Sequence, residues 1–129
     1  MQMDDEEALV NAFIISTKKA RYKYFLSRPR LRKRFTSELG HFKGLDLRFV
    51  VPIPPSQHHP AEILTILKSK GAGTLCRVIS ENWDIDGHEV DLLDALEITV
   101  GRQMGTFLSC VPGKLAYFED EDIRCILQR

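Results

Sequence analysis

The chain has 129 residues, of which 43% are hydrophobic, with 18 basic and 18 acidic side chains. This length and balance predict one soluble domain with a core of its own, and they exclude a mini-protein held together by disulfides or a metal. No apolar run approaches the roughly 20 residues that span a bilayer, so we expect no membrane segment.

The N-terminus and the cysteines indicate a cytoplasmic protein. Residues 4–7 are four consecutive acids, where a secretory signal would carry positive charge. The three cysteines lack CxxC spacing and fit reduced thiols better than a disulfide framework.

The zero net charge conceals an uneven distribution. Residues 1–50 hold 11 basic and 6 acidic side chains, an excess of five positive charges, whereas residues 51–129 hold 7 and 12. Nine of the basic residues lie between Lys18 and Arg34, a stretch without a single acid. This predicts either a surface for an anionic partner or helices that pack beside the acidic half of this chain or of a second copy.

The N-terminal segment predicts a first helix from Asp4 or Asp5, which would cap it, to about Leu26. A broad apolar arc on this helix would face the core. Ile15, Tyr22 and Leu26 form a second, narrower stripe on the other side. This stripe would either pack within the domain or meet a partner chain, for example the second copy in a homodimer.

A second helix is expected after a break at Ser27 and Pro29, with an apolar seam from Leu31 to Phe42. Residues 1–44 then form a basic helical segment and residues 45–129 an α/β portion. No linker is long enough to divide them, so residues 1–129 are expected to be a single globular domain.

The rest of the chain predicts a sheet covered by helices. Helices are expected at 60–70 and 92–100, and strands at 47–53, 75–79, 88–90, 106–111 and 114–119. Residues 123–128 fit a further strand, with a terminal helix as the alternative. Asp86 and Gly87 favour a tight hairpin turn, and Pro112 and Gly113 favour a type II turn. The predicted fold class is α+β: two N-terminal helices, then a mixed sheet of four to six strands with a C-terminal antiparallel meander.

The acidic loop 84–91 is the candidate metal site. The turn accounts for Asp86 and a helix cap accounts for Asp91, which leaves Asp84, His88 and Glu89 as candidate ligands of a divalent cation. Metal-bound water there would hydrolyse phosphodiesters. A small metal-dependent hydrolase is therefore the alternative function.

Cys110 and His88 are the candidate catalytic residues. A thiolate nucleophile needs a base such as His88 to lower its pKa, although a cysteine inside an apolar run is typical of a core. The sequence has no GxGxxG, Walker A, GxSxG or HExxH motif, so we expect no cofactor.

The basic segment is the favoured functional surface. It interleaves cations with aromatic residues, which suits contact with the phosphates and bases of a nucleic acid or with another polyanion. Tyr22 is interpreted as the aromatic side chain least needed for packing, and Trp83 as a lid over the core edge or an exposed anchor. The candidate phosphate contacts are Arg28, Arg30, Lys33 and Arg34. The sequence thus favours a non-enzymatic binding or interaction module.

Overall fold

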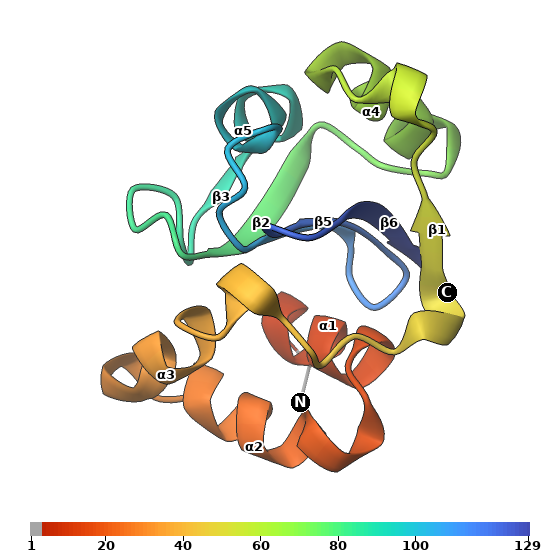
Figure 1. Ribbon diagram of the computed structural model, residues 1–129. Coiled ribbons are helices and arrows are strands. Elements are labelled where there is room, and N and C mark those ends of the chain that lie inside the picture. The colour runs from red at the N-terminus through yellow and green to blue at the C-terminus, as the bar shows by residue number, and fades with distance from the viewer. Residues whose placement is uncertain (1–3) are drawn as a thin grey trace.

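The computed structural model describes residues 4–129 (Figure 1). The helices of this part of the chain are α1 (Asp5–Phe13), α2 (Ser16–Leu26), α3 (Arg32–Thr36), α4 (Pro60–Ser69) and α5 (Leu92–Thr99). Its strands are β1 (Val50–Pro52), β2 (Leu75–Ser80), β3 (Glu89–Asp91), β4 (Thr106–Val111), β5 (Leu115–Glu119) and β6 (Arg124–Gln128). Short 3₁₀ helices are η1 (Pro29–Leu31), η2 (Leu39–His41), η3 (Leu47–Phe49) and η4 (Pro55–Gln57).

The six strands form one sheet in the order β1-β6-β5-β4-β2-β3, and every neighbouring pair among them is antiparallel. The α+β class and the C-terminal meander β4-β5-β6 are confirmed. The expected mixed character of the sheet is wrong, because each described strand runs opposite to its neighbours. Pro52 pairs with Cys125 from the edge strand β1. Proline is tolerated there because an edge strand leaves one row of N–H positions unused.

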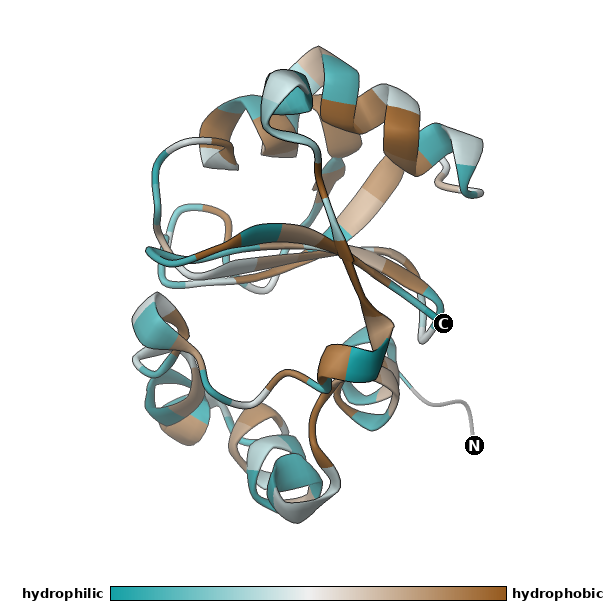
Figure 2. Cartoon of the chain, turned by 45° about the vertical axis from the view of Figure 1, so that its right-hand side comes forward, coloured by the Kyte–Doolittle hydropathy of each residue, from teal (hydrophilic) through white to brown (hydrophobic). Residues whose placement is uncertain are grey.

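Helices cover both faces of the sheet. Figures 1 and 2 show α4 and α5 on one side and α1, α2 and α3 on the other. Side chains alternate along each strand, so Phe107 and Phe118 pack against α1–α3, whereas Leu108 and Tyr117 pack against α4 and α5. Both faces are therefore buried, which explains why β4 and β5 are apolar almost throughout.

The first helix ends at Phe13, so the prediction of one helix to Leu26 is wrong. Ile14 and Ile15 are extended; Ile14 forms a bridge with Leu45, and the N–H of Ile15 donates to the carbonyl of Gly44 at 2.8 Å. β-Branched side chains favour such extended backbone over helix. The chain then restarts as α2 in a new direction.

The predicted second stripe is consequently not an exposed surface. Tyr22 is 1% exposed and belongs to the core, while Ile15 and Leu26 are half-buried. The stripe that suggested a homodimer is thus largely covered within the chain. The predicted second helix is also shorter than expected, because η1, α3 and η2 divide residues 29–41.

The local predictions in the C-terminal half mostly hold. β2 pairs with β3 through Cys76 and Val90, although a loop over residues 81–88 joins them instead of a two-residue turn. The N–H of Lys114 donates to the carbonyl of Val111 at 2.9 Å across the Pro112-Gly113 turn, where Gly113 has the φ of 71° that a type II turn requires. Residues 124–128 are a strand and not a terminal helix.

Within residues 4–129, none of the helices combines the length and the apolarity needed to cross a bilayer.

Candidate functional site

The predicted phosphate contacts lie together at the corner between α2 and α3. Ser27 ends α2, and Pro29 opens η1. The corner exposes four cations at close spacing: Arg28, Arg30, Lys33 and Arg34. These four residues are called the cationic face below.

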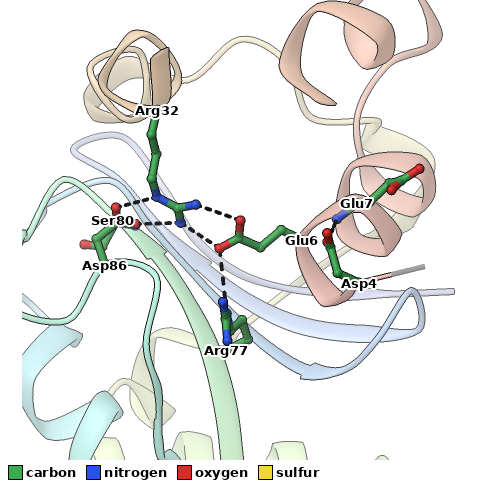
Figure 3. A network of polar contacts seen from close by, with 7 residues as sticks. All are labelled: Asp4, Glu6, Glu7, Arg32, Arg77, Ser80 and Asp86. Carbon is green, nitrogen blue, oxygen red and sulfur yellow. Dashed lines mark hydrogen bonds and ion pairs between the residues drawn. The ribbon is translucent and has the colours of Figure 1, made fainter. Parts of the chain in front are cut away.

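Arg32, in contrast, points from α3 toward Glu6 and Asp86 (Figure 3). Its guanidinium donates to both carboxylate oxygens of Glu6 at 2.7 Å and to both oxygens of Asp86 at 2.7 and 3.0 Å. Burial opposes its charge, but the hydrogen bonds to Glu6 and then Asp86 outweigh this effect and raise the pKa of Arg32. Arg77 approaches Glu6 from β2 at 3.8 Å. This clamp fastens α1 and α3 to the loop after β2.

Tyr22 does not belong to the surface, which corrects the prediction that it is the freest aromatic residue. Its hydroxyl donates to Glu38 at 2.9 Å, and its ring packs edge-on against Phe35 with 4.8 Å between the centroids. Burial, followed by the hydrogen bond to Glu38, raises the pKa of Tyr22 to about 12. A base could not stack on this ring without opening the core.

Two other aromatic residues are exposed beside the cations instead. Trp83 is 66% exposed, and the ammonium of Lys33 lies 3.9 Å from the centre of its ring. Tyr24 is 51% exposed, with the guanidinium of Arg28 at 5.1 Å. Trp83 is therefore exposed and does not form a lid over the core edge. Its position between polar residues of a loop was the sequence signal for this.

A shallow pocket of about 240 Å³ lies between α3 and Trp83, lined by Lys33, Thr36, Ser37, Glu81 and Trp83. It joins the cationic face to the loop after β2. The sequence offered no reason to place Glu81 beside Lys33, because 48 residues separate them.

Two acids of the acidic loop 84–91 have structural roles. Asp86 is engaged by Arg32 and also accepts the N–H of Ser80 at 2.8 Å. Asp91 caps α5 by accepting the N–H of Asp94, as predicted. In the part of the chain that the structure describes, no group of three or more His, Cys, Asp or Glu side chains is placed to hold a metal ion. The structure thus does not bring Asp84, His88 and Glu89 together as ligands.

The environment of Cys110 disfavours the thiolate that a nucleophilic cysteine requires. It packs at the margin of the core beneath α4 and α5, and its sulfur contacts the carbonyl of Leu108 at 3.6 Å. Burial raises the pKa of Cys110 to about 12, so the thiol is protonated at neutral pH. His88 is exposed in the loop immediately before β3, and no contact joins it to Cys110 within residues 4–129.

Glu119 is a buried carboxylate that the sequence analysis did not single out. It is fully covered and accepts the N–H of Gly101 at 3.1 Å, the N–H of Gln103 at 2.7 Å and the hydroxyl of Tyr117 at 2.7 Å. Gln103 has a φ of 60°, in the left-handed region. Glu119 therefore fixes the loop between α5 and β4.

Arg124 extends this polar cluster to a pocket of about 290 Å³ at the turn between β5 and β6. Its guanidinium lies 3.6 Å from Glu119 and 3.2 Å from Nδ1 of His58. Because a guanidinium only donates, Nδ1 of His58 accepts and its Nε2–H donates to the carbonyl of Ile53 at 3.1 Å. The hydrogen-bonding groups of Arg124, His58 and Glu119 are thus partners of one another, and we interpret them as structural.

Comparisons with protein families, with curated proteins and with solved structures give no match to this chain.

Proposed function

We propose that the chain is a non-enzymatic binding module whose cationic face contacts a polyanion. The observation that carries the proposal is the pairing of Lys33 with the exposed ring of Trp83, next to two further exposed cations, Arg30 and Arg34. Cations fix phosphates, and exposed aromatic rings accept bases.

The charge pattern supports this proposal over internal neutralisation. Two of the nine cations between Lys18 and Arg34 form ion pairs with acids of the described chain. Arg32 pairs closely with Glu6 and Asp86, and Arg21 lies 3.8 Å from Glu38. Among residues 4–129, no ion pair involves Arg30, Lys33 or Arg34. Their charge is therefore free to attract an anionic partner and to release its counterions.

Salt-dependent binding tests the proposal. A labelled single-stranded oligonucleotide and heparin are titrated with the protein, with anisotropy as the readout, at salt concentrations from about 50 to 200 mM. The triple variant Arg30→Gln, Lys33→Gln, Arg34→Gln should bind more weakly. Its plot of log affinity against log salt should be shallower by about two units, because a single strand contributes roughly 0.7 per phosphate contact.

A matched variant separates a local contact from a change in net charge. Lys68→Gln, Arg102→Gln, Lys114→Gln removes three exposed cations outside the cationic face. It should keep the salt slope of the parent. Equal losses in both triple variants, or no polyanion binding by the parent at the lowest salt, would overturn the proposal.

A further inference from the structure

The pocket beside Trp83 presents an aromatic ring on a firmly held loop. The N–H of Asn82 donates to the hydroxyl of Ser80 at 2.9 Å, and the N–H of Asp84 donates to the side chain of Asn82 at 3.1 Å. Ile85 is buried in the core beneath α4 and α5, and Arg32 holds Asp86. The loop is thus anchored on both sides of Trp83, while Trp83 itself stays 66% exposed.

Glu81, which carries a carboxylate, lines the same pocket. Its backbone is fixed because its N–H donates to the carbonyl of Gly105 at 2.9 Å. The side chain lies over Gly40, where a Cβ atom would stand 2.8 Å from Oε1. Within residues 4–129, the carboxylate of Glu81 takes part in no hydrogen bond or ion pair. An ionised carboxylate only accepts hydrogen bonds, so Glu81 is an acceptor that no donor of residues 4–129 occupies.

We propose that this pocket binds one unpaired base of a single-stranded nucleic acid and prefers guanine. The inference rests on the proposed function and names its ligand. The volume of about 240 Å³ is below the roughly 300 to 1,000 Å³ of sites for drug-sized ligands, which suits a group the size of one base. The base would stack on Trp83, as unstacked bases do on aromatic side chains.

The preference for guanine follows from the hydrogen-bonding groups. Guanine presents two adjacent donors on its Watson–Crick edge, the N1–H and the 2-amino group, which match the two oxygens of Glu81. Adenine and cytosine each present a single amino group there, beside a ring nitrogen that accepts and would face a carboxylate oxygen. A cationic ligand is disfavoured because the ammonium of Lys33 lines the pocket.

Lys33 would change partners when a base enters. Its ammonium is a compact charge on a flexible stem, so it can leave the ring of Trp83 and contact a phosphate of the same strand. Base stacking is stronger than an exposed contact between a cation and a ring, which favours this exchange. The cationic face then supplies affinity, and the pocket supplies base preference.

The experiment uses Trp83 as its own reporter, because it is the only tryptophan of the chain. Four short single strands of thymidine, each with G, A, C or T at the central position, are titrated into the full-length protein at about 50 mM salt. We expect quenching of Trp83 fluorescence and at least about fivefold tighter binding of the guanine strand, the smallest discrimination usual for a good bidentate base contact.

Two variants separate the base pocket from the cationic face, with anisotropy of labelled strands as the readout. Glu81→Gln should abolish the preference for guanine and keep the salt slope, whereas the exposed control Glu97→Gln on α5 should keep both. Trp83→Ala should lower the binding affinity for all four strands by a similar factor.

The outcomes distinguish the two proposals. Salt-dependent binding without quenching of Trp83, or with equal affinities for the four strands, overturns the base pocket and leaves the cationic face standing. Retention of the guanine preference in Glu81→Gln overturns the role of the carboxylate. Absence of binding to any strand overturns this inference, and absence of heparin binding as well overturns the proposed function.

Discussion

Arg32 and Asp86 are separated by 54 positions in the sequence and are joined by two hydrogen bonds, of 2.7 Å from Nε and 3.0 Å from Nη2. The same guanidinium holds Glu6. One side chain therefore connects the first helix, the third helix and the loop that carries Trp83.

Replacing Arg32 should destabilise the protein strongly. Arg32→Ala leaves the carboxylates of Glu6 and Asp86 without their shared cation, and loss of charge-assisted hydrogen bonds in such a partly buried pair costs about 1.5–3 kcal/mol. Urea denaturation monitored by circular dichroism measures this loss. Arg34→Ala, an exposed neighbour, should change the free energy of unfolding by about 0.5 kcal/mol at most. Similar values for the two variants would contradict the clamp.

Glu119→Gln should destabilise the protein and loosen the loop between α5 and β4. One carboxylate oxygen becomes an amide group that donates, and it must face the N–H of Gly101, the N–H of Gln103 or the hydroxyl of Tyr117. We expect a loss of about 1–3 kcal/mol, the cost of an unsatisfied buried polar group. Hydrogen exchange at the two amides should accelerate, and the exposed Glu121→Gln should leave it unchanged. Unaltered exchange in Glu119→Gln would refute this role.

The three thiols should be unreactive in the folded protein. Burial raises the pKa values of Cys76, Cys110 and Cys125 to about 12, so almost no thiolate is present at pH 8. A thiol reagent should modify the cysteines of the native protein slowly. In denaturant it should modify all three cysteines rapidly. Rapid modification of Cys110 in the native state would restore it as a candidate nucleophile.

His41 should titrate above its ordinary pKa. A hydrogen bond to Asp122 at 3.2 Å, followed by the charge of Glu121, raises the pKa of His41. Since its folded pKa exceeds the unfolded value, the imidazolium stabilises the fold below the unfolded pKa, and this contribution is lost as the pH rises through the folded pKa. An NMR titration of the imidazole measures the shift. Asp122→Asn should lower the pKa and Asp84→Asn should not; identical titration curves would contradict the contact.

The C-terminal half is predictable because its signals are local. Asp91 caps α5 and the Pro112-Gly113 turn joins β4 to β5, and each depends only on residues within a few positions. The antiparallel order of the sheet is not predictable in this way, since the pairing of β1 with β6 joins segments some 75 residues apart along the chain.

The candidate site was predictable in its charge and not in its geometry. The spacing of Arg28, Arg30, Lys33 and Arg34 identified the cationic face. The prediction that Tyr22 is exposed was wrong because the pairing of Ile14 with Leu45 interrupts the helix. No local sequence signal near Ile14 indicates a partner 31 positions away. Glu81 and Trp83 reach Lys33 only through the three-dimensional fold.

The two helical layers differ in charge as well as in position. Residues 4–44, which contain α1, α2 and α3, hold ten basic and five acidic side chains, while residues 60–70 and 89–99, which contain α4 and α5, hold two basic and five acidic. α5 lies across the sheet from α2 and α3 (Figure 1). The molecule therefore carries a permanent dipole moment across the sheet despite its zero net charge. A distant polyanion exerts a torque that turns α2 and α3 toward it, so encounter should be oriented and fast at low ionic strength, and it should slow as the Debye length falls.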